Sequence, residues 1–474
     1  MNVDRERLDR ALNPRTVLVV GDKGPNYQWL SNLSEFKGRV YSVQLDEKEI
    51  PGIAAMGVEN FSSVLDVPGE IDLLICAVPR QVAPFIVVDA AKKNVGGVAM
   101  FTSGFAEIGD EVGLELHQKV VGAALGAGMP LIGPNCMGVY NRRLGVKFSQ
   151  QQEQGDGGNV GIISQSGALG GSMTAGAQKL GVKVTRTISI GNAAVISEAD
   201  YLEYLRDDPD TQIIMMYLEG LRDGRRFASI LRDVARHKPV IVWRGGRTAA
   251  GARAVQSHTA SLASDDLIWD ALMRQSGAIA ADSLEEALDT LQAVVRFPRS
   301  SARRLGLVAM SGGQSVAITD QFQKAGFDVP TLTQRSYDRL GEFFSAVGAF
   351  YPNPLDASST IRREGENLQK ILEILAEDAN IDGVAIEMQT RDYPDRSDFL
   401  DQQTAAAREY QERTGKPVVV VLPERDFAAH PESVMVARYL VAQGGVPAYP
   451  SFARGAQAFA RAVRYWAWRD AVES

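Results

Sequence analysis

One histidine lies in a stretch of small and hydroxylated residues, GARAVQSHTASLAS, at positions 251–264. The chain has only four histidines, and this one, His258, has Ser257 and Thr259 beside it. A neutral imidazole can attack phosphorus through one ring nitrogen while a carboxylate accepts the proton on the other nitrogen. The preceding segment, RGGRTAAGARA, is rich in Gly and Ala and buries little apolar surface, which predicts a mobile loop. An exposed loop histidine with no chemical role is the alternative interpretation.

Two further features could serve such a histidine. Glu219 ends the apolar stretch IIMMYLE, and ligands bind at the carboxyl ends of strands in open α/β sheets. Another apolar run leads into a predicted helix start, whose first amide groups have no intrahelical partners and attract anions. A phosphoryl group could be held there by Ser164, Gln165, Ser166 and Gly167. Plain N-capping of that helix, and a solvated end for the Glu219 strand, are the alternatives.

The stretch LIGPNCMGVYN, at 131–141, predicts a strand that ends in a tight glycine and proline loop. Asn135 and the backbone amides of this loop could face a ligand. Cys136 has no companion histidine in the sequence, so a buried structural thiol is a better interpretation than a nucleophile. The first turn of the chain, VVGDKGPNYQW, lacks GxGxxG, and Asp22 would lie poorly against a pyrophosphate.

The elements that must position these residues are short apolar strands alternating with amphipathic segments, which predicts an α/β fold with parallel sheets. The pattern is interrupted by the polar stretch QQEQGDGGN and again by RFPRSSARR. We therefore expect three α/β domains, at 1–150, 158–297 and 303–474. The second and third begin alike, with NVGIISQSGALGGSM and RLGLVAMSGGQSVAI, which indicates one architecture used twice.

Composition excludes several classes of protein. The net charge of −8 and the lack of Lys/Arg runs argue against a nucleic-acid partner. No apolar run is long enough to span a membrane, and the charged N-terminus does not read as a signal peptide. Two cysteines without CxxC spacing predict neither a zinc site nor a disulfide framework, so we expect no metal ligands and a cytoplasmic protein.

Several motifs recur in a specific order along most of the chain, and they are strongest between residues 100 and 290. They are SGFAEIG, LIGPNCMGVYN, ISQSGALG, SIGNAA, the segment from EYLRDD to GRRF around Glu219, KPVIVWRGGRTAAGARAVQSHTASLA, and NPLD. Together they closely resemble the NDP-forming acyl-CoA synthetases. The ADP-forming acetyl-CoA synthetases and the α subunit of succinyl-CoA synthetase belong to that superfamily.

The resemblance implies a Rossmann-like CoA-binding domain followed by two flavodoxin-like, succinyl-CoA synthetase-like domains. It implies that His258 is phosphorylated, that Glu219 orients it, and that the turn from Ser164 to Gly167 holds the phosphoryl group. The enzyme would interconvert acyl-CoA, ADP and phosphate with carboxylic acid, CoA and ATP, through an acyl phosphate and a phosphohistidine. The residues expected around coenzyme A are Gly21, Val78, Pro79, Ser103, Gly104, Asn135 and Cys136.

The family binds its nucleotide in an ATP-grasp domain, which this sequence does not contain. The resemblance therefore implies a separate β subunit that carries ATP-grasp, ATP or ADP and Mg²⁺, in an assembly such as α2β2, and a small carboxylic acid as substrate. The sequence departs from the family at HTASLAS, usually HTGALAG, and at the first glycine turn, which is altered to GDKGPNYQW. A third departure is Gln44-Leu45-Asp46, usually Asn-Pro-Lys, which removes a basic residue expected near the CoA phosphates. A catalytically silent CoA-binding protein and an NAD-dependent dehydrogenase are the competing interpretations.

Overall fold

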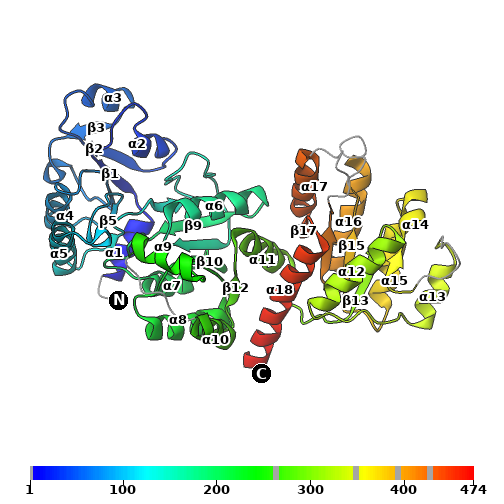
Figure 1. Ribbon diagram of the computed structural model, residues 1–474. Helices are drawn as coiled ribbons and strands as arrows, with labels where there is room; N and C mark the ends of the chain where they lie inside the picture. Colours follow the sequence, from blue (N-terminus) through cyan, green and yellow to red (C-terminus); the bar gives the residue numbers. More distant parts are fainter. Residues whose placement is uncertain (1–3, 260–265, 345–351, 390–396, 424–430, 474) are drawn as a thin grey trace. The chain divides into compact units, whose positions relative to one another are not determined.

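The computed structural model describes residues 4–259, 266–344, 352–389, 397–423 and 431–473 (Figure 1). Within these ranges, the side chains of 256–259, 363, 431–434 and 437 are not described. Two compact units form the chain. The first contains residues 1–178 and 183–282, and the second contains 179–182 and 283–474.

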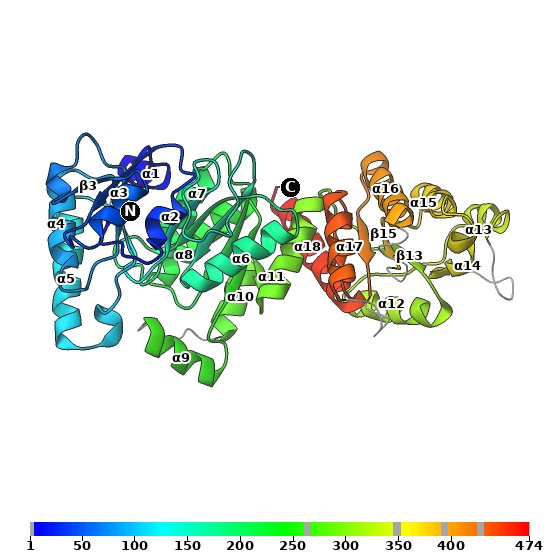
Figure 2. The ribbon, with the colours of Figure 1, turned by 90° about the horizontal axis from the view of Figure 1, so that it is seen from above.

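The first sheet of the first unit is fully parallel, with the order β3-β2-β1-β4-β5-β6. Its strands are β1 (Thr16–Val20), β2 (Arg39–Val43), β3 (Glu59–Phe61), β4 (Leu73–Cys76), β5 (Gly97–Met100) and β6 (Leu131–Ile132). The central strands are apolar and buried throughout, as expected where helices cover both faces of a parallel sheet. Figure 2 shows two of these helices, α4 (Ala83–Lys92) and α5 (Glu111–Gly126), packed against each other.

The second sheet has the order β12-β11-β10-β8-β9-β7. Its strands are β7 (Gly138–Asn141), β8 (Val160–Ser164), β9 (Val184–Ser189), β10 (Ile213–Leu218), β11 (Val240–Arg244) and β12 (Ile279–Ala281). All pairs are parallel except β7 with β9. Residues 138–141 lie within the predicted first domain, yet they form hydrogen bonds in the second sheet. The helices that follow its strands are α6 (Gly167–Lys179), α7 (Glu198–Asp207), α8 (Gly224–His237), α9 (Ala249–Thr259) and α10 (Asp266–Ser276).

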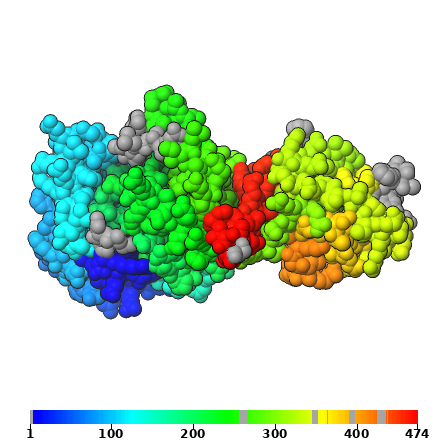
Figure 3. All heavy atoms as spheres, turned by 90° about the horizontal axis from the view of Figure 1, so that it is seen from below, coloured from blue at the N-terminus to red at the C-terminus, as the bar shows by residue number. Residues whose placement is uncertain are grey.

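The N-terminal helix α1 (Arg5–Leu12) fastens the first sheet to the second. In Figure 3 the dark blue N-terminal residues lie against the green residues of the second sheet domain. The Tyr204 hydroxyl on α7 donates to Asp9 at 2.7 Å, and the Asn141 side chain donates to the Leu12 carbonyl at 3.0 Å. These bonds join helix and sheet, so the two sheets share one unit.

The second unit contains a parallel sheet with the order β14-β13-β15-β16-β17. Its strands are β13 (Leu305–Ala309), β14 (Leu355–Asp356), β15 (Gly383–Glu387), β16 (Val418–Val421) and β17 (Ala448–Tyr449). Its longer helices include α11 (Leu284–Arg296), α12 (Gly312–Lys324), α15 (Asn367–Glu377), α16 (Ser397–Thr414), α17 (Pro431–Gln443) and α18 (Phe452–Glu473). Helices α11 and α18 pack together, and the Arg454 guanidinium binds the buried Asp289 carboxylate at 2.6 Å.

The short elements are α2 (Gln28–Asn32), α3 (Ile50–Ala55), α13 (Gln334–Gly341), α14 (Ser358–Arg363) and the 3-10 helices η1 (Val64–Asp66) and η2 (Ala106–Ile108). None of the helices in the described ranges is long and apolar enough to cross a bilayer. The domain boundaries expected from the sequence stay a prediction. Helix α11 lies inside the predicted second domain, whereas it falls in the second of the two compact units.

Candidate active site

Glu219 and the turn after β8 lie at the same edge of the second sheet. Strands β8 and β10 are parallel neighbours, and Ser164 pairs with Tyr217 at the carboxyl end of both. Glu219 follows two residues later and is only 7% exposed. The Tyr217 hydroxyl donates to the Glu219 carboxylate at 3.3 Å, and burial followed by the Glu219 charge raises the pKa of Tyr217. A buried carboxylate thus lies at this edge, where it accepts a hydrogen bond from Tyr217 at the end of the same strand.

The side chain of Gln165 connects the two strand ends. Its Oε1 accepts hydrogen bonds from the amides of Glu219 and Gly220, and its Nε2 donates to the Gly220 carbonyl at 2.9 Å. The backbone amide of Gln165 donates to the Tyr217 carbonyl at 3.1 Å. The hydrogen-bonding groups of this side chain therefore point into the protein rather than toward a bound phosphoryl group.

The start of α6 has free amide groups. The Ser166 hydroxyl accepts from the Leu169 amide at 3.3 Å and caps the helix, while the buried Ser164 hydroxyl donates to the Ser166 carbonyl at 2.6 Å. Among the described residues, the amides of Gly167 and Ala168 have no hydrogen-bond acceptor. Gly167 is also required sterically, because a Cβ there would lie 2.4 Å from the Met137 Cγ. Free amides at the positive end of a helix are groups that can bind an anion.

His258 is carried by α9, and its side chain is outside the described residues. The expectation of a loop is wrong for residues 251–259, which belong to helix α9 (Ala249–Thr259), where four of the 11 residues are the strong helix former Ala. The Thr248 hydroxyl accepts from the Gly251 amide at 3.0 Å and helps to start the helix. Helix α9 lies against η2. Residues 260–265, which complete the HTASLAS motif, lie outside the described residues.

Arginine and aspartate pairs fix both ends of the segment that carries His258. The Arg244 guanidinium, at the end of β11, is buried, binds Asp266 at 2.9 Å and lies 5.2 Å from the Trp269 ring centroid. Arg247 binds Asp270 at 3.0 Å and also pairs with Asp282. We call Arg244, Arg247, Asp266 and Asp270 the clasp. Sequence analysis missed it, although an arginine in the strand end VIVWR is an unusual residue to bury.

The residues expected around coenzyme A gather at the carboxyl edge of the first sheet. They follow β1, β4, β5 and β6, which are neighbours in the sheet. Gly21 has φ +86, and a Cβ there would lie 2.6 Å from the Val78 Cγ1, so the first turn requires glycine. The Thr102 hydroxyl donates to the Val78 carbonyl at 2.7 Å, and Glu107 accepts from the Gly104 amide at 2.6 Å. Pro79, Ser103 and Asn135 are at least partly exposed there, whereas Cys136 is buried.

The turn after β1 already contains an internal anion. The buried Asp22 carboxylate accepts from the amides of Trp29 at 3.0 Å and Leu30 at 2.9 Å, and burial raises its pKa. Gln44, in the departure from Asn-Pro-Lys, donates to the Asp22 carbonyl at 2.8 Å and accepts from the amide of Asp46 at 3.0 Å. The altered first glycine turn and the Gln44-Leu45-Asp46 segment are thus hydrogen-bonded to each other through Gln44 and the Asp22 carbonyl. A CoA phosphate would find the amides of Trp29 and Leu30 already bound to Asp22.

The carboxyl edges of the first two sheets meet. The Asn192 amide, after β9, donates to the Pro134 carbonyl at 3.0 Å, and its side chain donates to Glu107 at 2.8 Å. A Cβ at Gly191 would lie 2.3 Å from the Pro134 carbonyl, so the two loops approach closely. Asn135 has a positive φ of 57 at this contact. The edge expected to bind coenzyme A therefore adjoins the unit's second edge, where Glu219 lies.

Comparison with known proteins decides the family. Residues 15–142 match the family described as CoA binding domain, and residues 157–294 match the succinyl-CoA ligase like flavodoxin domain. The α subunit of acetate–CoA ligase [ADP-forming] II from Pyrococcus furiosus is 35% identical over 79% of this chain and 81% of its own length. This chain belongs to the NDP-forming acyl-CoA synthetases. The resemblance seen in the sequence motifs is thereby confirmed, and so is the fold class.

Other members of the synthetase family show how much of the enzyme this chain represents. The acetate–CoA ligase [ADP-forming] I of Archaeoglobus fulgidus is 34% identical over 79% of this chain, which spans only 54% of that protein. A structure of the dinucleotide forming acetyl-coenzyme A synthetase 1 of Ca. Korarchaeum cryptofilum, in complex with phosphate and ADP, is 28% identical, with a TM-score of 0.83 and 100% of this chain covered. The chain thus spans most of a synthetase α subunit and about half of a longer relative.

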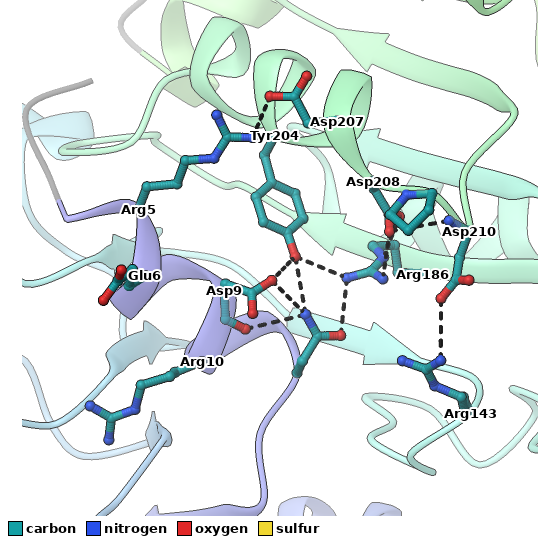
Figure 4. Close-up of a pocket in the computed structure, with 12 residues that line it drawn as sticks. Arg5, Glu6, Asp9, Arg10, Arg143, Arg186, Tyr204, Asp207, Asp208 and Asp210 are labelled. Atoms are coloured by element: carbon teal, nitrogen blue, oxygen red, sulfur yellow. Dashed lines mark hydrogen bonds and ion pairs between the residues drawn. The ribbon is translucent and has the colours of Figure 1, made fainter.

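A large polar cavity of about 1010 Å³ lies elsewhere in this synthetase chain (Figure 4). It is lined by α1, the end of α7 and the turn before β10, so it opens at the amino edge of the second sheet, opposite Glu219. In Figure 4 the side chains of Asp9, Tyr204 and Arg186 point toward one another, and Arg186 binds the buried Asp208 at 3.1 Å. These side chains form hydrogen bonds and ion pairs with one another. We therefore interpret the cavity as part of the polar packing between α1 and α7 rather than as the candidate site. No group of three or more His, Cys, Asp or Glu side chains in the described ranges could hold a metal ion.

The two cysteines of this synthetase chain are expected to be unreactive in the folded protein. Both thiols are buried, and burial raises the pKa of Cys76 to about 11 and that of Cys136 to about 12. The nucleophilic thiolate is therefore rare at about pH 8. Mass spectrometry after alkylation should find both thiols unmodified in the folded chain and modified in denaturant. Above the unfolded thiol pKa, ionisation favours the unfolded state, so stability should fall as pH rises toward 11. Rapid alkylation of folded Cys136 would contradict the assignment.

Opening the clasp is expected to slow phosphoryl transfer. In Arg244→Met, Asp266 loses its buried partner, which should cost about 1–3 kcal/mol of stability. The end of the His258 segment then has several positions, and we expect roughly tenfold slower histidine phosphorylation. Arg206→Met is the matched control, because Arg206 binds Asp233 at 3.0 Å on the surface of the same unit. Equal phosphorylation rates in the two variants would show that the clasp has no part in positioning.

Proposed function

We propose that the chain is the α subunit of an NDP-forming acyl-CoA synthetase that is phosphorylated on His258. In this proposal His258 attacks the γ-phosphorus of ATP, the bond to ADP breaks, and a phosphohistidine forms. The carboxylate of a small acid then takes the phosphoryl group and regenerates the histidine. The thiol of coenzyme A attacks the resulting acyl phosphate, phosphate leaves, and acyl-CoA is released. Every step is reversible, so the same residues serve both directions.

Three parts of the site have separate roles in this scheme. Glu219 accepts a hydrogen bond from the N–H of the second imidazole nitrogen, which fixes the tautomer and stabilises the charge on the phosphorylated ring. The free amides of Gly167 and Ala168, with the Ser166 hydroxyl beside them, stabilise the phosphoryl oxygens. The buried Ser164 hydroxyl donates to the Ser166 carbonyl and supports the turn from within. The edge that includes Gly21, Val78, Pro79, Ser103, Gly104, Asn135 and Cys136 holds coenzyme A, with the Asn135 loop nearest the thiol.

The contact between the two sheet edges is the observation that carries this proposal. Glu219 and the start of α6 lie at one edge, the coenzyme A residues lie at the other, and Asn192 and Glu107 join them. Helix α9, with His258, packs on η2, which contains Glu107. A phosphohistidine on this helix would thus be made close to the bound thiol. A dehydrogenase is not supported, because the turn after β1 lacks the dinucleotide glycines and its amides bind Asp22.

The scheme requires a partner that binds nucleotide. We propose an ATP-grasp β subunit that carries ATP or ADP and Mg²⁺, and an α2β2 assembly. The relative named as an α subunit supports this division, as does the longer relative of which the chain spans about half. We also propose that the protein works in the cytoplasm, where CoA, ATP and two reduced thiols are found together.

The test is to label the histidine. The chain is mixed with its candidate ATP-grasp partner, Mg²⁺ and ATP, and intact mass is used to detect a phosphoryl group that is labile in acid and stable in alkali. A panel of small carboxylic acids is then added with CoA, and loss of the label identifies the acid. We expect one phosphoryl group per chain. A chain that binds both its partner and ATP but stays unlabelled would support the catalytically silent CoA-binding interpretation instead.

A further inference from the structure

The geometry points to Gln165 as the positioning residue that fixes Glu219 against the phosphate turn. This inference rests on the proposed function, because it explains how the acid that orients His258 is itself held. It also assigns Gln165 a different role from the one that the sequence suggested, in which Gln165 was a candidate phosphate ligand.

The groups around Gln165 can be satisfied only by a carboxamide. Two donors, the amides of Glu219 and Gly220, converge on its Oε1, and one acceptor, the Gly220 carbonyl, lies 2.9 Å from its Nε2. A carboxylate accepts but cannot donate, and methionine does neither. Asparagine is one methylene shorter and would not span the distance between the strand ends. The site thus selects glutamine by its hydrogen-bonding pattern and its length.

Burial makes this pattern matter. Gln165 is 6% exposed, so water cannot replace a lost hydrogen bond, and each unsatisfied group at Glu219 or Gly220 would destabilise the local turn. Glu219 is the first residue after β10, where the sheet no longer holds the chain. The side chain of Gln165 supplies the missing bonds for two successive residues. Without it, the amides of Glu219 and Gly220 and the Gly220 carbonyl would each lose a hydrogen bond, so the peptide that carries the Glu219 carboxylate would be held less firmly.

The position of Gln165 in the chain links that peptide to the phosphate turn. Gln165 lies between Ser164 and Ser166, directly before the free amides of α6, and its own amide binds the Tyr217 carbonyl at 3.1 Å. One residue therefore fixes the distance between the acid and the anion site. Catalysis that depends on this distance should be sensitive to Gln165 even though its side chain does not face the reacting groups.

The experiment compares Gln165→Met and Gln165→Glu with wild type and with the matched control Gln178→Met. Gln178 lies on α6 in the same unit, is similarly buried, and donates to the Tyr140 hydroxyl at 3.3 Å. All four chains are assayed with the ATP-grasp partner for the rate of histidine phosphorylation at saturating ATP and for the ATP concentration at half the maximal rate. Melting temperature and amide hydrogen exchange at Glu219 and Gly220 are measured on the same chains.

We expect Gln165→Met to lower the maximal phosphorylation rate by at least about tenfold, with little change in half-saturating ATP, because the nucleotide site is elsewhere. Exchange at the Glu219 and Gly220 amides should rise. Gln165→Glu should be slower still at about pH 8, since a carboxylate repels the Gly220 carbonyl. When pH is lowered, the introduced carboxyl group gains a proton and a donor, so the gap between the two variants should narrow.

Three outcomes are informative. If Gln165→Met and Gln178→Met show equal decreases in phosphorylation rate and in melting temperature, the role of Gln165 is only structural and the inference fails. If Gln165→Met phosphorylates like wild type, the inference fails while the proposed function stands. If wild type itself is not phosphorylated, the proposed function fails, and the exchange at Glu219 and Gly220 still shows whether Gln165 holds this turn.

Discussion

Histidine phosphorylation is expected to disappear in His258→Gln. Glutamine has a similar length and can form hydrogen bonds, but it has no nucleophilic ring nitrogen, so no phosphohistidine can form. With the ATP-grasp partner, acyl-CoA formation should fall by about 10⁴-fold or more, to the background set by bound but uncatalysed reactants. The measurements are intact mass after incubation with ATP and Mg²⁺, and the rate of acyl-CoA formation.

The matched control for this variant is His237→Gln. His237 is an exposed histidine in the last turn of α8, within the same unit. We expect this variant to be labelled like wild type and to retain its activity. A label that persists in His258→Gln would place the phosphoryl group on another residue. Melting temperature and binding of the ATP-grasp partner are measured on both variants, and we expect neither to change. A His258→Gln chain that loses activity but still binds the partner has lost the chemical step rather than its fold.

Glu219→Gln is expected to have the second largest effect. The Tyr217 hydroxyl donates a hydrogen bond to the Glu219 carboxylate at 3.3 Å. A carboxamide retains the shape of the side chain and can still accept this hydrogen bond. It removes the negative charge that stabilises a protonated or phosphorylated imidazole. Replacing the carboxylate that orients a catalytic histidine in other enzymes lowers the rate by about 10²- to 10⁴-fold, and we expect a loss in that range here.

The kinetic parameter that changes in Glu219→Gln distinguishes a role of Glu219 in phosphoryl transfer from a structural role. Phosphorylation at saturating ATP should slow while half-saturating ATP stays unchanged, because the proposed nucleotide site is on the partner. The control is Glu115→Gln on α5, because the Glu115 side chain is 64% exposed and pairs with Lys119 at the surface. A Glu219→Gln chain that is phosphorylated at the wild-type rate would remove Glu219 from the mechanism.

Parallel strands at the turns were predictable from local pattern. Apolar runs such as VGIIS and IIMMYL are strands because they are short, β-branched in part and bounded by polar residues. The carboxyl ends of such strands meet at one edge, so the sequence pattern is enough to group Glu219 with the Ser164 turn. The helix at 249–259 was not predicted, since a glycine and alanine segment with one histidine has no apolar periodicity to reveal it.

The sequence by itself determined the family, the fold class and the candidate residues. These depend on local residue patterns and on the order of motifs along the chain, and both can be read without knowing any tertiary contact. The tertiary structure alone decided what those residues contact. It turned Gln165 inward to Glu219 and Gly220, filled the first turn with Asp22, and paired Arg244 with Asp266 at the base of the His258 segment. These contacts join residues that are 7 to 55 positions apart. Only burial and the crossing of strands bring such partners together, and neither can be read from one segment.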